Sequence, residues 1–175
     1  MKIAGDEPDI LMITEVIPKA QSLPIASALL DIHGYSLYTS FDPLSSNLGS
    51  SGLRGILIYV SNRLNVTEVS FGRTAFSEQL WVQLPLVGND RLLLGCAYRS
   101  PSQNAQLSTR ELCDIIRTAC ASNPSHLLVT GDFNLPHIDW DNHFSPAPST
   151  DPSHEFLEMI KDCFLFQQVT EPRVY

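Results

Sequence analysis

The sequence lacks any apolar run of the roughly 18–20 residues that a membrane-spanning helix needs. Its longest apolar segments, such as 56–60, have the length of a β-strand. Residues 1–8 contain no apolar stretch of the kind found in secretory signals. The four cysteines form neither a Cys-x-x-Cys pair nor a zinc-binding pattern with histidine. We therefore expect an intracellular protein of a reducing compartment, with buried free thiols and no membrane partner.

Basic residues are also scarce, since 11 Lys and Arg stand against 19 Asp and Glu and give a net charge of −8. Proteins that bind nucleic acid without regard to its sequence neutralise phosphates with Lys and Arg, so this balance argues against that class. It does not exclude a nuclease, because a magnesium site is built from carboxylates. With 175 residues, 43% of them hydrophobic and 17% charged, the chain fits one globular domain over 1–175.

Short apolar runs bounded by Gly, Pro, Asn, Asp or Ser predict β-strands. Six such runs occur, at 9–15, 35–41, 55–61, 78–86, 91–99 and 126–132. The turn residues 87–90 lie between the fourth and fifth runs and predict a hairpin there. From the middles of these strands we expect four side chains in the core: Leu57, Trp81, Leu93 and Leu128.

Apolar residues at helical spacing predict three helices. The first covers 23–32, the second opens with a capping box formed by Ser108 and Glu111, and the third runs over 152–164 from a proline near its start. Helices and strands do not alternate regularly along the chain. This order predicts an α/β sandwich with a mixed sheet rather than a doubly wound fold.

Three strand ends carry side chains suited to phosphate chemistry. Glu15 ends the first strand, at the sheet rim where α/β proteins place ligands. Asp132 and Asn134 follow a glycine that allows close backbone approach, and a carboxylate with an amide can activate water and bind a phosphate oxygen. Tyr98 and Arg99 can both donate to phosphate. Taken singly, each group also fits an ordinary strand end or an Asx-rich turn.

Five segments occur in one order along the chain. They are 9–15 ending in Thr-Glu, 54–60 beginning Arg-Gly, 80–82 reading Leu-Trp-Val, 98–101 reading Tyr-Arg-Ser-Pro, and 131–140 reading Gly-Asp-Phe-Asn-Leu-Pro-His-Ile-Asp-Trp. This order resembles the endonuclease/exonuclease/phosphatase superfamily, and most closely the endonuclease domain of non-LTR retrotransposons. The features typical of retrotransposons are Asp139-Trp140 and the later spacing of Phe164, Gln167, Val169 and Pro172.

The resemblance implies a two-sheet α/β sandwich and a magnesium-dependent DNA endonuclease, with Mn²⁺ as an alternative ion. It implies that Glu15 binds the metal, Tyr98 contacts phosphate, Asp132 activates water, and Asn134 binds the phosphate. From its position at a strand end, we also expect Arg99 to contact the substrate phosphate. In the full-length protein the resemblance implies fusion to a reverse transcriptase and a nuclear location.

Family members usually begin one strand earlier, with an active-site asparagine, and end with a Ser-Asp-His motif that this sequence does not contain. The resemblance therefore implies a chain truncated at both ends, a sandwich incomplete at both termini, and little or no nuclease activity of this fragment. Two alternatives stay open. One is a non-catalytic remnant or binding module that keeps the fold, and the other is a phosphatase of small phosphoesters.

Overall fold

The computed structural model describes residues 7–19, 24–45, 52–72, 74–101 and 104–169. A three-stranded sheet has the order β1-β3-β2, formed by β1 (Ile10–Thr14), β3 (Ile56–Ser61) and β2 (Tyr35–Thr39). A four-stranded sheet has the order β4-β5-β6-β7, formed by β4 (Thr67–Val69), β5 (Gln79–Pro85), β6 (Arg91–Tyr98) and β7 (His126–Asp132). The helices are α1 (Ser27–Leu30), α2 (Ala105–Ala121) and α3 (Pro152–Asp162).

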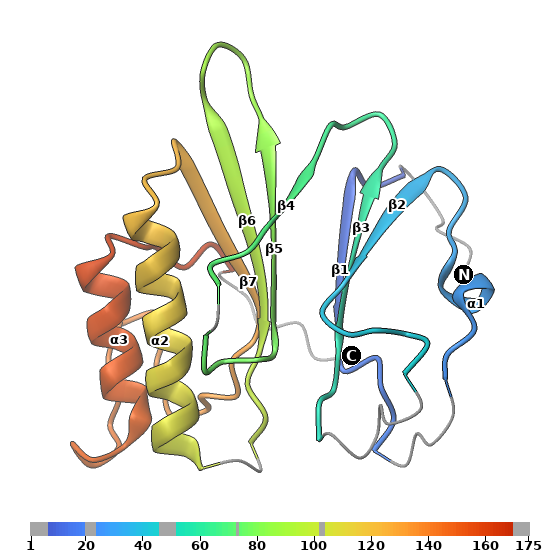
Figure 1. Cartoon of the computed structure of the whole chain (residues 1–175). Helices are drawn as coiled ribbons and strands as arrows, with labels where there is room; N and C mark the ends of the chain where they lie inside the picture. The colour runs from blue at the N-terminus through green and yellow to red at the C-terminus, as the bar shows by residue number, and fades with distance from the viewer. Residues whose placement is uncertain (1–6, 20–23, 46–51, 73, 102–103, 170–175) are drawn as a thin grey trace.

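The two sheets stand face to face, and α2 and α3 cover the outer face of the four-stranded sheet (Figure 1). Neighbouring strands are antiparallel except β6 and β7, which run parallel and are joined through α2. This arrangement confirms the predicted α/β sandwich. No helix in the described ranges combines the length and apolar composition that a membrane crossing requires.

One layer of the core lies between the two sheets. Alternate side chains of β3 point toward alternate side chains of β5 and β6, as strand geometry demands. The buried members are Ile56, Ile58, Val60, Leu80, Val82, Leu84, Leu94, Cys96 and Tyr98. Because Tyr98 belongs to this layer, the packing of the two sheets also fixes the end of β6.

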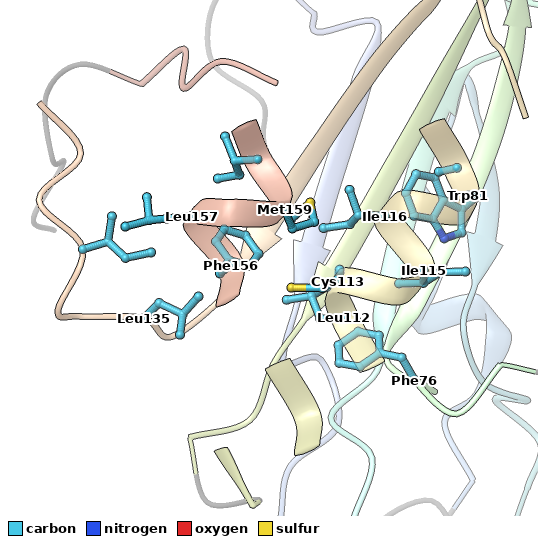
Figure 2. Close-up of a cluster of buried hydrophobic side chains, with 14 of the residues drawn as sticks. Phe76, Trp81, Leu112, Cys113, Ile115, Ile116, Leu135, Phe156, Leu157 and Met159 are labelled. Carbon is cyan, nitrogen blue, oxygen red and sulfur yellow. The ribbon is translucent and has the colours of Figure 1, made fainter. Parts of the chain in front are cut away.

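A second layer lies between the four-stranded sheet and the helices (Figure 2). The Trp81 side chain packs across Gly95 of the neighbouring strand, where an added Cβ would lie 2.2 Å from the indole ring. Phe71 meets the same indole edge-on at 5.5 Å between ring centroids. From the helices, this layer receives Leu112, Ile115, Ile116, Phe156 and Met159.

All six predicted strands occur, with ends shifted by two residues or fewer, and the hairpin at 87–90 is confirmed. Leu57, Trp81 and Leu93 are buried as predicted. The core prediction for Leu128 is wrong, since 44% of this residue is exposed. Its neighbours in β7 pack toward the helices, so Leu128 faces the other side of an edge strand, where the described residues cover it only in part.

The predicted capping box is also wrong, because α2 begins three residues before Ser108. Its N-cap is Asn104, whose side chain accepts a hydrogen bond from the Leu107 amide at 3.2 Å. Ser108 is buried inside the helix. The helix predicted over 23–32 is one short turn, with residue 23 outside the described ranges, and the three-residue β4 was not predicted.

All four thiols are free, but the prediction that they are buried holds for two of them. Cys96 and Cys113 are buried, whereas Cys120 and Cys163 are half-buried. Burial raises the pKa of both Cys96 and Cys113 to about 12, so these thiols stay protonated at neutral pH.

Candidate functional site

The site lies where β1, β6 and β7 end together, at the lower edge of the two sheets in Figure 1. Glu15 follows β1 in a left-handed backbone conformation with φ of 58°, which is uncommon for a residue other than glycine. The Tyr98 hydroxyl, at the end of β6, donates a hydrogen bond of 2.7 Å to Glu15 Oε1. Burial, and next this bond, raise the pKa of Tyr98 to about 12. Tyr98 is therefore a neutral donor that links the two sheets.

Arg54 makes a second contact with the Glu15 carboxylate. Arg54, just before β3, places Nε 3.3 Å from Glu15 Oε1, and its side chain is only 16% exposed. The backbone amides of Arg54 and Gly55 donate to the carboxylate of Glu78, with 3.1 Å for the Gly55 bond. Burial raises the pKa of Glu78, against the opposing effect of these backbone donors. The buried carboxylate thus fixes the backbone that carries Arg54 toward Glu15.

The 54–55 turn has no room for a larger residue. Gly55 has a φ of 73°, and a Cβ there would lie 2.8 Å from the side chains of Ile17 and Phe41. The amide of Ile17 also donates to the Arg54 carbonyl at 2.7 Å. Packing on both sides therefore defines the position of Arg54 next to the end of β1.

Asp132 lies next to Tyr98 because the two residues are partners in the parallel β6–β7 register. One step earlier in that register, Gly131 has a φ of 139°, and a Cβ there would lie 1.8 Å from the Ala97 carbonyl oxygen. Only glycine allows the backbones of β6 and β7 to come this close, which confirms the close backbone approach expected for Gly131 from the sequence. The backbone of Asp132 is thereby set beside that of Tyr98, whose hydroxyl contacts Glu15.

Asn134 is fixed by contacts on both sides. Its backbone amide donates to Asp132 Oδ1 at 3.1 Å, and its side-chain amide donates to the Arg99 carbonyl at 2.8 Å. The backbone is left-handed, with φ of 50°. The contact between the Asn134 amide and Asp132 is an Asx turn, so the alternative that these two residues form a turn after the strand also holds. A role of Asp132 and Asn134 in the site is compatible with this turn, because the turn orients both polar side chains.

Arg99 is buried, with 3% of the residue exposed. Its Nε donates to Thr109 Oγ1 of α2 at 2.8 Å and its Nη1 donates to the Asn134 carbonyl at 3.1 Å. Burial lowers the pKa of the guanidinium. These contacts hold the 132–134 turn against α2, while the phosphate contact expected for Arg99 stays a prediction.

A cavity of about 670 Å³ opens beside Asp132 and Asn134. Its walls come from the 133–140 loop, the starts of α2 and α3, and the 167–169 segment; they include His137, Trp140 and Asp151. His137 Nδ1 lies 2.8 Å from Asp151 Oδ2. Hydrogen bonds from Ser153 and His137 lower the pKa of Asp151 to about 2. The cavity is therefore continuous with the rim that carries the site and has a fixed imidazole in its wall.

In the described ranges, no three His, Cys, Asp or Glu side chains are grouped closely enough to form a metal cluster. Magnesium does not need such a cluster, because it keeps several waters and binds through one or two carboxylates plus substrate phosphates. Glu15 fits this requirement. Both Tyr98 and Arg54 contact its Oε1, which leaves Oε2 as the oxygen that could ligate an ion.

The structure brings together the residues that the sequence singled out: Glu15 with Tyr98, Tyr98 with Asp132, and Asp132 with Asn134. Their catalytic and binding roles stay predictions. Sequence reasoning missed Arg54 and Glu78 as members of the site. The sequence shows only that each lies within two residues of the start of an apolar strand, and not that the two segments meet.

Comparison with solved structures supports the fold. The chain is similar to D. rerio TDP2 humanized by 14 mutations, with 13% identity and a TM-score of 0.50 over 92% of this chain and 58% of that chain. It is also similar to the human Nocturnin catalytic domain with bound sulfate anion, with 15% identity and a TM-score of 0.50 over 85% and 55%. The chain thus spans little more than half the length of these structures. At such identities the likeness concerns the fold alone.

No curated protein matches the chain in sequence. A family model does match, over residues 2–169, and it describes the Endonuclease/Exonuclease/phosphatase family. That match covers nearly the whole chain and agrees with the two-sheet architecture and with the order of the motifs. The chain therefore belongs to the endonuclease/exonuclease/phosphatase family.

Proposed function

We propose that the chain belongs to the DNA endonuclease domain of a non-LTR retrotransposon protein and hydrolyses phosphodiester bonds with Mg²⁺, or with Mn²⁺ in its place, at a low rate. The single observation that carries the proposal is the meeting of Glu15, Tyr98 and Asp132 at one rim. The Tyr98 hydroxyl contacts Glu15, and Tyr98 pairs with Asp132 in the β-ladder. Tyr98 thus has one acidic residue at its hydroxyl and another as its partner in the β-ladder.

Each side chain has a role that its contacts support. Glu15 would hold the ion, which when bound supplies Lewis-acid stabilisation of charge on the phosphate. Asp132 is the base that orients and deprotonates the attacking water. The Asn134 amide carries two N–H donors; one is used by the Arg99 carbonyl, and the other is the proposed donor to a phosphate oxygen. Tyr98 has a single O–H, which it donates to Glu15; the proposed contact with the phosphate requires this O–H to turn from Glu15 to a phosphate oxygen when substrate binds.

The retrotransposon origin rests on the motif residues around the cavity. Trp140 meets Phe156 edge-on at 6.3 Å between centroids, and Gln167 and Val169 line the same cavity wall; Pro172 lies outside the described ranges. A reverse-transcriptase reading frame next to the gene, and a nuclear location of the full-length protein, are the corresponding expectations.

Nicking of supercoiled plasmid under enzyme excess tests the function. Because the sequence contains no Ser-Asp-His motif, we expect only weak cleavage in Mg²⁺, which EDTA abolishes and which Asp132→Ala reduces by at least about a hundredfold. The matched control is Asp114→Ala, which removes an aspartate from the exposed face of α2 and should cleave like the wild type.

Other outcomes decide between the alternatives. DNA binding without metal-dependent nicking would contradict the proposal and favour a non-catalytic module. Faster hydrolysis of p-nitrophenyl phosphate than of DNA would favour a small-phosphoester phosphatase.

A further inference from the structure

We infer that the cavity beside Asp132 binds a nucleobase, that of the nucleotide next to the scissile phosphate. The inference rests on the proposed function and names a subsite for its substrate. The first observation is one of position: Asp132, the proposed base, and Asn134, the proposed phosphate donor, also line the cavity. A phosphodiester at this rim would place a neighbouring base within reach of the opening.

The size and walls of the cavity suit a planar, mostly apolar group. Its volume of about 670 Å³ lies inside the range of small-molecule sites. Apolar and flat side chains form much of the wall, among them Phe133, Leu135, Pro136 and Trp140. Such walls with a few fixed polar groups are typical of sites that bind one small ring system.

The charged side chains in the cavity wall favour binding of a nucleobase over binding of several phosphates. Its wall contains two carboxylates, Asp132 and Asp151, and one cation, the buried guanidinium of Arg99, whose Nε donates to Thr109 and whose Nη1 donates to Asn134. Several phosphates would therefore meet more negative than positive charge. A neutral base avoids this repulsion, while its phosphate stays outside, at the rim.

His137 is the residue that would recognise the base. Its side chain is 58% exposed, yet its Nδ1 is held by Asp151 at 2.8 Å. Asp151 in turn is fixed as the N-cap of α3, where it accepts from the Ser153 amide at 2.9 Å. An exposed imidazole with one nitrogen anchored offers its ring face for stacking and Nε2 for a hydrogen bond.

Tryptophan fluorescence gives a binding readout independent of cleavage. Trp81 is buried and hydrogen-bonded to Gln79, whereas Trp140 is half-buried in the cavity wall. Titration with each of the four deoxynucleoside 5′-monophosphates should quench Trp140 in a saturable way, and Trp140→Phe should remove that signal. Inorganic phosphate should not reproduce it.

The variants test which residues bind. We expect His137→Ala to weaken mononucleotide affinity about tenfold. Ala105→Leu, which narrows the cavity, should also weaken this affinity, although it removes no polar group. His143→Ala, an exposed histidine of the neighbouring turn that is outside the cavity wall, should bind like the wild type.

Equal quenching by phosphate and by mononucleotides, or unchanged affinity in both cavity variants, would overturn the inference. Plasmid cleavage without nucleotide-dependent quenching would overturn it while leaving the proposed function intact. Quenching without cleavage would support the subsite and contradict the proposed function.

Discussion

The Tyr98 hydroxyl donates to Glu15 Oε1 across 2.7 Å, and the two residues are 83 positions apart in the sequence and belong to different sheets. This bond joins the end of β6 to the end of β1. It also orients a carboxylate whose backbone is held in a left-handed conformation. The relationship thus connects the packing of the sandwich to the chemistry of its rim.

Tyr98→Phe should therefore affect both stability and activity. We expect a loss of about 1.5 kcal/mol in the free energy of unfolding, since the hydrogen bond to a charged acceptor is removed. The metal concentration for half-maximal cleavage should rise about tenfold, because a ligand loses its orienting partner. Urea unfolding and a Mg²⁺ titration of nicking measure the two effects.

Tyr59→Phe is the matched control. Its hydroxyl donates to the Leu30 carbonyl at 2.7 Å, away from the site. It should cost about 1 kcal/mol of stability and leave the metal dependence unchanged. If both variants shifted the metal dependence equally, Tyr98 would have no specific role in placing Glu15.

Arg54 and Arg63 offer a second comparison, because they flank opposite ends of β3 and each pairs with an acid that flanks β1. The Arg54–Glu15 pair is largely buried on the arginine side, whereas the Arg63–Asp9 side chains are 68% and 64% exposed. Arg54→Met should reduce cleavage, because Glu15 loses the largely buried cation beside its Oε1; it should change stability by less than about 1 kcal/mol, because Arg54 Nε and Nη1 are buried without a hydrogen-bond partner among the described residues. Arg63→Met should cost less than about 1 kcal/mol and leave cleavage unchanged. Equal losses of cleavage in the two variants would contradict the positioning of Glu15 by Arg54.

Gly131→Ala should disrupt the β6–β7 contact at the site. A Cβ would lie 1.8 Å from the Ala97 carbonyl oxygen, so the strands must separate. We expect a loss of more than about 3 kcal/mol, combining steric and backbone strain. Gly34→Ala has a similar backbone requirement, φ of 87°, with nothing within 4 Å of the added atom. It should cost about 1–2 kcal/mol, and thermal unfolding that ranked the two variants in the opposite order would contradict the geometry.

The lowered pKa of Asp151 predicts that part of the free energy of unfolding is lost in acid. Its pKa is lowered from 3.8 to about 2 in the folded protein, so its ionised form stabilises the fold. That contribution is present above about pH 4 and is lost as the pH falls toward 2. Asp151→Asn keeps an N-cap acceptor but cannot ionise. Urea unfolding at pH 5 and pH 3 should show a smaller drop in the variant, and equal drops would contradict the assignment.

Much of the fold could be predicted from the sequence, because its strands are short apolar runs between turn residues. The start of α2 could not. Ser108 and Glu111 satisfy the capping pattern, but Ser108 is buried in the helix and Asn104 provides the cap. Leu128 has the sequence setting of a core residue, and only the order of the strands shows that β7 lies at an edge.

The site was predictable where one residue ends one strand, as for Glu15, Tyr98 and Asp132. It was not predictable where function depends on a contact between distant segments. Glu78 lies 24 positions from Arg54, and only the packed sandwich shows that its buried carboxylate holds the 54–55 backbone. Likewise, the burial of Arg99 against Thr109 depends on how α2 packs on the sheet.

The most direct test of the account is a double-mutant cycle on single-turnover DNA cleavage in Mg²⁺, with Glu15→Gln, Asp132→Asn and the double variant. If Glu15 and Asp132 form one catalytic unit, each single variant should lose at least about a hundredfold in rate, and the double variant should be little slower than the slower single variant. Losses that multiply in the double variant, or a single variant that cleaves at the wild-type rate, would contradict a shared site at the rim of the two sheets.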